Sequence, residues 1–379
     1  MSTAMNTALN TANTPPAWAW LHALREPALV LGWNLAQWEH VIRIARRLRL
    51  LGRLAHSVHA ADLQHAVPAQ AARHLLAEHR YASWRSDGLA WVLERLPDML
   101  GPVGYPLVLL KGAAYMGQGL AIGQGRLPSD VDILVPLEHI ADAHSRLLSA
   151  GWQETALDAH DQRYYREWSH ELPPMRHPLH GLELDLHHNI LPPVARTHVD
   201  ASMLLARLQP SRWPQWQVLA PHDQVLHSAA HLFHDSELRD RIRDLVDLDG
   251  LLRHFGSTPH FWGVLVERAS ALGLHESLAL ALHFCTQWLG TPVPPAALAD
   301  AHARGLSRSK SWWLLPLLQA VLEPTDTDRL PSRRQALAAQ ALLLRHHLGR
   351  MPLCLLLPHL WHKLKRSTAS VASDQTTAG

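Results

Sequence analysis

The sequence has very little cysteine and almost no net charge. Its 379 residues include two cysteines, Cys285 and Cys354, which are too few for a disulfide framework or a four-thiolate zinc site. Lys and Arg together number 35, and Asp and Glu 33, so the formal net charge is only +2. This balance excludes a broadly basic protein that neutralises many nucleic-acid phosphates.

Long apolar runs are missing as well. The most apolar late stretch, residues 351–361, is interrupted by Pro358 and is too short to cross a bilayer, so we expect no integral membrane segment. Residues 1–16 lack a basic region followed by an apolar one, so no signal peptide is expected. These absences favour a cytoplasmic protein, and the polar ends, 1–16 and 367–379, are predicted to be disordered.

The chain does contain enough apolar sequence for a globular fold, with 47% apolar and 18% charged residues. Apolar residues recur mostly at three- and four-residue spacing over residues 17–100 and again over 201–366, which predicts helices. Between these regions, residues 101–200 contain strand-like runs and many turn residues. The sequence therefore predicts an α+β fold, with a small mixed β-sheet core between large N- and C-terminal helical regions.

Short apolar or alternating runs within this core predict strands at residues 107–110, 131–135 and 182–187. An amphipathic pattern over residues 137–150, followed by Gly151, predicts a helix that ends at the glycine. We also expect a strand at residues 163–168.

Three acidic residues stand on two of the predicted strands. Asp130 and Asp132 are two residues apart, so they point to the same face of their strand. Two adjacent carboxylates repel each other, and a shared proton or a divalent cation relieves that repulsion. If the strand that carries Asp185 lies beside the first one, all three carboxylates converge on one site.

The residues around these acids form a recognisable combination. It consists of an apolar strand that ends in Lys111-Gly112, then Arg126, then Ser129-Asp130-Val131-Asp132-Ile133-Leu134-Val135. It resembles the nucleotidyltransferases of the DNA polymerase β-like superfamily, and more narrowly their uncharacterised bacterial branch. The run from Leu184 to His187 is similar to the strand that carries the third acid in that family. The resemblance covers roughly residues 105–190.

The resemblance implies two-metal phosphoryl chemistry on a nucleoside triphosphate. Asp130, Asp132 and Asp185 would be the catalytic acids and would hold Mg²⁺ or Mn²⁺, which prefer hard oxygen ligands. The nucleotide-binding set would be Lys111, Gly112, Arg126, Ser129 and His187. Lys111 or Arg126 would neutralise triphosphate charge, and backbone N–H groups after Gly112 would receive a phosphate. For His187 the role stays open between substrate orientation, a general base and an ordinary strand histidine.

Two departures from the family pattern are visible. The first turn has Lys111-Gly112 in place of the usual Gly-Ser, so a serine ligand to the phosphates is missing and Lys111 takes its place. The segment 115–125 is rich in glycine, which fits either a nucleotide-covering loop or a linker.

Two further clusters of polar residues, one of histidines and one of charged residues, are not assigned to a metal site or to catalysis. His227, His231 and His234 share one helix face, but a zinc site needs further ligands, so we interpret them as polar histidines near the active-site cleft. The remaining histidines, 29 in all, are scattered and mostly lack ligand spacing. The charge-dense run from Arg239 to Asp247 is interpreted as a solvated helix face.

The predicted function is transfer of a nucleoside monophosphate from an NTP to an acceptor hydroxyl, with release of pyrophosphate. The acceptor is open among a small molecule, a sugar intermediate, a protein and an RNA end. One alternative is a catalytically inactive nucleotide-binding module, although the presence of all three acids argues against it. Another is a toxin-like nucleotidyltransferase that acts on tRNA or protein.

Overall fold

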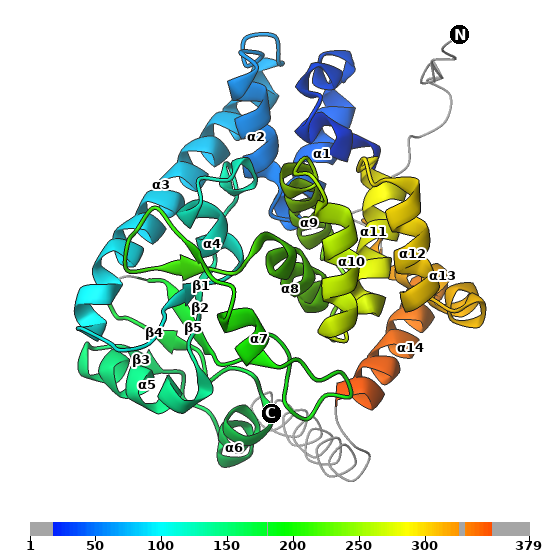
Figure 1. Cartoon of the computed structure of the whole chain (residues 1–379). Coiled ribbons are helices and arrows are strands. Elements are labelled where there is room, and N and C mark those ends of the chain that lie inside the picture. Colours follow the sequence, from blue (N-terminus) through cyan, green and yellow to red (C-terminus); the bar gives the residue numbers. More distant parts are fainter. Residues whose placement is uncertain (1–17, 180, 326–329, 351–379) are drawn as a thin grey trace, which may run out of the picture.

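The computed structural model describes residues 18–179, 181–325 and 330–350. The ends predicted to be disordered, 1–16 and 367–379, and the apolar stretch 351–361 lie outside the described residues. Within them, no helix combines the length and apolar character needed to span a membrane. The predicted α+β architecture is confirmed, because a mixed sheet lies between two groups of helices (Figure 1).

The N-terminal part consists of helices, as predicted. Two 3-10 helices, Ala19–Leu24 and Pro27–Gly32, precede α1 (Leu35–Arg47), α2 (Leu51–Ala60) and the long α3 (Ala69–Leu100). Asn34 begins α1 with a capping box, because its side chain accepts a hydrogen bond from the Gln37 N–H and the Gln37 side chain accepts one from the Asn34 N–H. Helix α3 then runs along one side of the molecule down to the sheet (Figure 1).

The sheet has the strand order β3-β4-β5-β2-β1-β7-β6. Its strands are β1 (Val108–Leu109), β2 (Asp130–Leu134), β3 (Gln153–Glu154), β4 (Met175–Arg176), β5 (Glu183–His187), β6 (Gln209–Pro210) and β7 (Gln217–Val218). The central strand β2 pairs in parallel with β5 and antiparallel with β1. Its apolar residues Val131 and Ile133 are buried, so the strand is held in register by the core on one face.

Short helices connect these strands. They are α4 (Lys111–Gly117), the 3-10 helices Ala121–Gly123 and Leu137–His139, α5 (Ile140–Ser149), α6 (Ala159–Trp168) and α7 (Ala201–Leu205). Helix α5 ends before Gly151, whose φ of +94° is in the region that favours glycine, as the sequence predicted.

Two expectations are wrong. Residues 163–168 are the second half of helix α6 and not a strand, because Asp158 caps that helix by accepting a hydrogen bond from the Asp161 N–H. Residues after 201 are also not purely helical, since β6 and β7 join the sheet through pairing of β7 with β1. Their two-residue length leaves no alternation for a sequence pattern to reveal.

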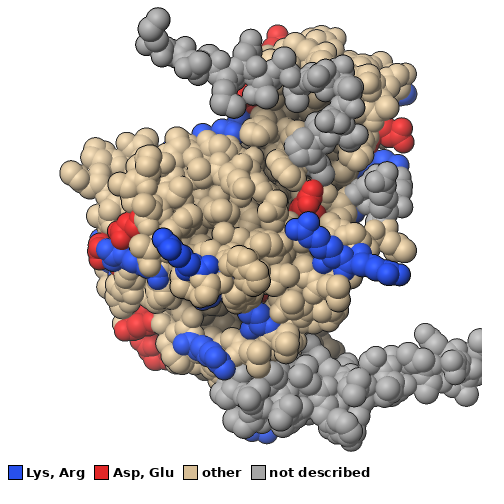
Figure 2. All heavy atoms as spheres, turned by 90° about the vertical axis from the view of Figure 1, so that its right-hand side faces the viewer, with Lys and Arg blue, Asp and Glu red and all other residues tan. Residues whose placement is uncertain are grey.

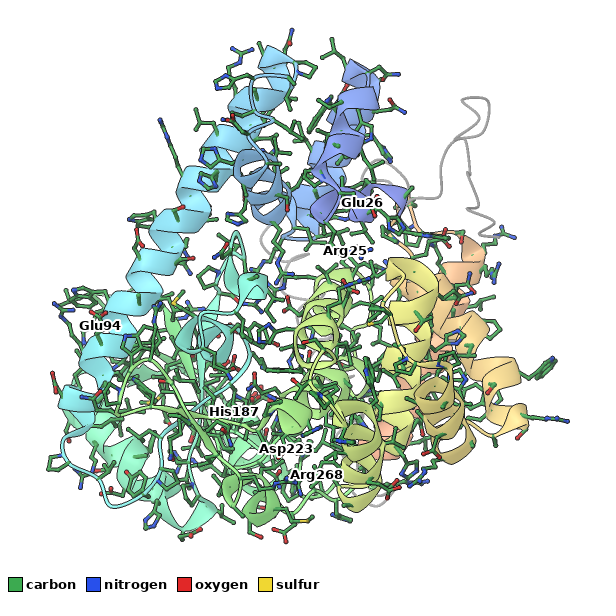
Figure 3. All side chains as sticks on the ribbon, turned by 45° about the horizontal axis from the view of Figure 1, so that its top comes forward. Arg25, Glu26, Glu94, His187, Asp223 and Arg268 are labelled. Atoms are coloured by element: carbon green, nitrogen blue, oxygen red, sulfur yellow. The ribbon has the colours of Figure 1, made fainter. Side chains whose placement is uncertain are left out.

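The C-terminal helices pack beside the sheet on the right of Figure 1. They are α8 (Pro221–Phe233), α9 (Ile242–Phe255), α10 (Phe261–Ala271), α11 (His275–Leu289), α12 (Pro295–Gly305), α13 (Arg308–Leu322) and α14 (Arg333–Arg350). Asp223 of α8 and Arg268 of α10 form a buried bidentate pair at 2.7 and 2.9 Å and lie together in Figure 3. On the face of these helices seen in Figure 2, basic side chains are separated by wide uncharged areas.

A buried ionic network joins three distant segments of the chain. Asp247 of α9 accepts hydrogen bonds from Arg53 of α2 and, at 3.1 Å, from Arg126 Nε of the loop before β2. All three side chains are buried. The prediction of a solvated face for residues 239–247 is therefore wrong for Asp247 and also for Asp244, which is buried too. The charges of Arg53, Arg126 and Arg243 hold the pKa of Asp247 below its usual range against the opposing effect of burial.

Candidate active site

Three carboxylates meet where β2 and β5 run side by side. The register places Asp132 directly opposite Asp185, and Asp130 lies two residues before Asp132 on the same face of β2. One oxygen of each carboxylate lies within 4.8 Å of one oxygen of each of the others. The predicted convergence of the two strands is therefore present. Glu183, opposite Asp130, is instead paired with Arg176 at 2.7 Å.

Asp132 is the buried centre of this group, with 2% of its surface exposed. Its Oδ1 accepts hydrogen bonds from Lys111 Nζ at 2.7 Å and from His187 Nε2 at 3.1 Å. Burial alone would raise the pKa of Asp132, but these two partners hold it well below the usual range. Asp132 is therefore a stable carboxylate. The same contact raises the pKa of Lys111 despite the opposing effect of burial, so Lys111 stays charged.

Asp185 has the opposite electrostatic environment. Burial, and then the negative charges of Asp132 and Glu171, raise its pKa to about 8. Its Oδ1 is buried and has no hydrogen-bond partner in the described part of the chain. An unsatisfied carboxylate oxygen beside two other carboxylates fits a divalent cation such as Mg²⁺, which takes hard oxygen ligands and compensates their mutual repulsion.

Lys111 and Gly112 form the sharp turn at which α4 begins, directly after β1. Lys111 has φ = +45°, a left-handed conformation that costs energy for a residue other than glycine. Gly112 lets the guanidinium of Arg126 approach its Cα, because a Cβ there would collide with Arg126 Nη1. Arg126 is thus placed against Gly112 and Asp247, where it supports this turn. Ser129 donates a hydrogen bond to Asp130 Oδ1 at 2.9 Å.

His187 connects the carboxylates to a residue that the sequence analysis missed. Its Nε2 contacts Asp132 and its Nδ1 lies 3.4 Å from Glu171 Oε2. Burial would lower the pKa of His187, but the hydrogen bond to Asp132 and the charge of Glu171 raise it. His170, Glu171 and His187 also form a group with metal-ligand spacing, yet both ring nitrogens of His187 already face carboxylates. Glu171 reaches this position through an isolated bridge to His187, which no local sequence pattern indicates.

The glycine-rich segment 115–125 is packed and fits the linker interpretation. Gly250 of α9 faces Ile122 so closely that a Cβ there would collide with it. Arg53 of α2 donates a hydrogen bond to the Ile122 carbonyl at 2.5 Å. The segment therefore lies between α2 and α9 as part of the contact between the two helical regions.

A cavity adjoins the carboxylates on the side of helix α8. None of the three aspartates lines it, but Lys111 and His187, which both contact Asp132, do. His227 and His231 of α8 and His234, which caps the C-terminus of that helix, line it too, so these histidines lie near the acidic group as predicted. Burial, followed by the charge of Lys111, lowers the pKa of His227 to about 3 and that of His231 well below its usual range. Burial and Arg345 lower the pKa of His234 to about 4.

These neutral histidines predict a fold that loses stability in mild acid. Above pH 6.5 they are neutral in both states, but below it only the unfolded chain takes up the protons. One pH unit below 6.5, each such histidine lowers the free energy of unfolding by about 1.4 kcal/mol. Asp185 and His187, whose pKa values are raised, take up protons in the folded state over the same range and offset most of this loss. We expect a net decrease of no more than about 1 kcal/mol between about pH 7.5 and pH 5.5, measured by urea denaturation.

The matched control for this prediction is His227→Gln, which removes one of the titrating groups. The variant should show a smaller difference between the two pH values than the natural chain does. An equal dependence of stability on pH in the variant and the natural chain would contradict the assignment of His227 as neutral in the fold.

The fold and this site define a class: α+β proteins that present convergent carboxylates and a lysine at adjacent strands of a mixed sheet. A family model described as "Uncharacterised nucleotidyltransferase" matches residues 34–290, and the chain belongs to that family. The match includes the sheet, the carboxylates and helices α1 to α11. No curated protein and no solved structure matches the chain.

Proposed function

We propose that the protein is a Mg²⁺- or Mn²⁺-dependent nucleotidyltransferase of the DNA polymerase β-like type. It would transfer a nucleoside monophosphate from an NTP to an acceptor hydroxyl and release pyrophosphate. The observation that carries this proposal is the convergence of Asp130, Asp132 and Asp185 on two paired strands, with the unsatisfied Asp185 oxygen among them. Membership of a nucleotidyltransferase family supports the reaction class.

In this mechanism the three aspartates would hold the divalent cations, which supply charge stabilisation for the attacking and leaving oxygens. Lys111 stays protonated and stands beside Asp132, so its ammonium group is available to triphosphate oxygens. His187 contacts the same oxygen of Asp132 as Lys111 does, and Glu171 in turn contacts His187, so the two hold Asp132 in place. The acceptor oxygen bonds to the α-phosphorus while the bond to the bridging oxygen of pyrophosphate breaks, and the acceptor proton passes to solvent.

The test is incubation of the purified protein with each α-³²P-labelled NTP, a cell extract and Mg²⁺ or Mn²⁺. We expect label to appear on one component of the extract and to be absent when EDTA removes the metal. The labelled component and the NTP that supplies it identify the acceptor class and the base.

Label transfer that persists in EDTA would contradict the metal-dependent mechanism. NTP binding without transfer would instead support the inactive nucleotide-binding module. Calorimetric titration with each NTP, done on the same preparation, separates these two outcomes.

A further inference from the structure

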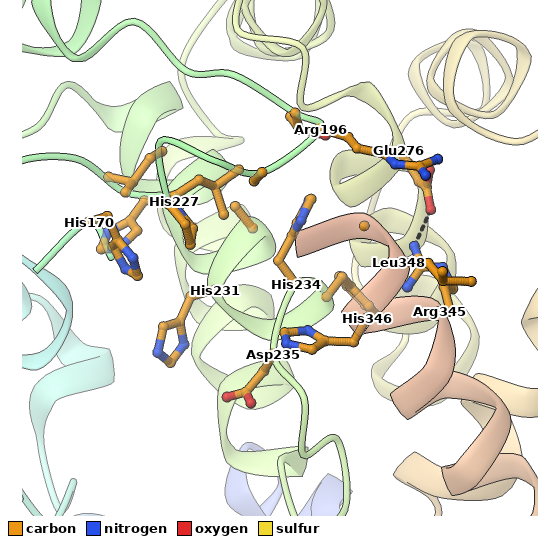
Figure 4. A pocket seen from close by; sticks show the side chains of 18 of the residues that line it. His170, Arg196, His227, His231, His234, Asp235, Glu276, Arg345, His346 and Leu348 are labelled. Carbon is orange, nitrogen blue, oxygen red and sulfur yellow. Dashed lines mark hydrogen bonds and ion pairs between the residues drawn. The ribbon is translucent and has the colours of Figure 1, made fainter. Parts of the chain in front are cut away.

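The cavity beside the acidic group extends from Lys111 and His187, the two partners of Asp132, to the C-terminal helices. Its volume is about 600 Å³, and its lining includes Lys111, Glu171 and His187 at one end and Arg196, Lys310 and Arg345 at the other. Figure 4 shows His170 at the first end and Arg196, Glu276 and Arg345 at the second. His227, His231 and His234 follow one another between the two ends. A volume of this size is typical of sites for small molecules.

The spacing of the histidines along helix α8 gives the distance between the two ends of the cavity. His227 lies near enough to Lys111, His187 and Asp132 for their charges to shift its pKa. His234, seven residues later, responds instead to Arg345, Glu276 and Lys310. At a rise of about 1.5 Å per residue, the two histidines are about 10 Å apart along the helix axis. The second end is therefore separate from the carboxylates but within reach of one small molecule that spans both.

The second end carries an excess of positive charge. Lys310 and Arg345 both bind the carboxylate of Glu276, and Arg196 lies on the same side of the cavity. Asp235 also lines the cavity but is paired with Arg241, so the three cations and Glu276 leave a net charge of +2 at this end. In the described part of the chain, the Arg196 side chain has no hydrogen bond or ion pair. This positive charge matches a phosphate monoester, which carries a charge of about −1.5 to −2 at neutral pH.

The middle of the cavity offers groups that suit hydroxyls. Arg241 donates a hydrogen bond to Nδ1 of His231 at 3.1 Å, and since Arg cannot accept, the proton of the neutral ring is on Nε2. His227 is buried and has both a donor and an acceptor nitrogen in its neutral form. A hydroxyl is likewise both donor and acceptor, so a row of neutral imidazoles fits a polyhydroxylated molecule.

We propose that this cavity binds the acceptor, a polyhydroxylated small molecule that carries a phosphate group. The phosphate binds Arg196, Lys310 and Arg345, and a hydroxyl at the other end of the molecule reaches the carboxylates. The role as acceptor rests on the proposed nucleotidyltransferase function. The anion site rests only on the cavity and its charges.

The first test removes phosphate monoesters from the acceptor pool. The low-molecular-mass fraction of a cell extract is treated with phosphatase, which is then removed before labelled NTP is added. Label transfer should be lost after this treatment and kept with heat-inactivated phosphatase. Transfer that survives the treatment would overturn the phosphorylated acceptor and leave the proposed function intact. If neither the treated fraction nor the control fraction gave transfer, the result would count against the proposed nucleotidyltransferase function. The anion site would then be decided by the second test.

The second test measures binding of inorganic phosphate to the full chain by calorimetry. Arg196→Gln and Arg345→Gln should each weaken phosphate binding about tenfold, since each removes a charge-assisted hydrogen bond. The control is Arg308→Gln, an exposed arginine of α13 that does not line the cavity and should leave binding unchanged. Arg196 is exposed, so its variant is expected to fold. Equal phosphate affinity in all three variants and the natural chain would overturn the anion site. In the transfer assay, Arg196→Gln and Arg345→Gln should raise the KM for the acceptor. If they raised the KM for NTP instead, these cations would belong to the triphosphate site and the proposal would be overturned.

Discussion

Replacing Asp132 with Asn is expected to reduce nucleotidyl transfer about a thousandfold or more. The carboxylate of Asp132 lies at the centre of the acidic group and would be shared by the bound cations. Loss of a metal ligand removes several kcal/mol of transition-state stabilisation, and about 4 kcal/mol corresponds to a thousandfold change in rate. The measurement is the initial rate of label transfer, together with Mn²⁺ binding, which should weaken in the same variant.

Two controls separate this effect from a loss of fold. Asp142→Asn changes a half-exposed carboxylate of α5 that binds Tyr105 and Arg146, and it should leave the transfer rate unchanged. Asp132→Asn also leaves Lys111 with one charged partner fewer, so its circular dichroism and melting temperature must be recorded. A correctly folded Asp132→Asn variant with a rate within tenfold of the natural chain would refute the assignment of Asp132 as a metal ligand.

The second large effect is on stability. Asp247→Ala should lower the free energy of unfolding by about 3–5 kcal/mol, because it leaves Arg53 and Arg126 buried without their carboxylate. Arg126 also packs against Gly112, so the Lys111–Gly112 turn loses its support and transfer activity should fall with stability. Urea denaturation followed by circular dichroism measures the loss.

Asp300→Ala is the matched control. Asp300 pairs on the surface with Arg304, which keeps a second partner in Glu267. Exposed ion pairs contribute little, so the urea midpoint of this variant should stay close to that of the natural chain. If Asp247→Ala behaved like the control, the buried network would not support the fold.

The acidic site was predictable because its signals are local. The two-residue spacing of Asp130 and Asp132 on an apolar strand indicates that both side chains lie on one face. The strict alternation from Leu182 to His187 indicates a second strand that carries Asp185. Pairing of the two strands in the structure then brings the three carboxylates together.

The remaining features depend on packing between residues far apart in the sequence. Glu171 reaches His187 through a single isolated bridge, and Asp247 is buried only because arginines from two other segments meet it. The basic cluster at the far end of the cavity needs Arg196 from a loop, Lys310 from α13 and Arg345 from α14. Residues 163–168 belong to helix α6 and not to a strand. The composition of this helix is polar, so no apolar pattern indicates where it begins after its cap, Asp158.

The Arg53–Asp247–Arg126 network also sets a minimum for any fragment of this protein. A fragment limited to the strands, residues 101–218, would contain Arg126 but neither Asp247 nor the α2 surface that covers it. Such a piece would expose an unpaired guanidinium and the apolar sides of the turn beside the acids. The shortest autonomous folding unit must therefore extend at least from α2 to α9, and residues 34–290, the part shared with the family, contain that unit in full.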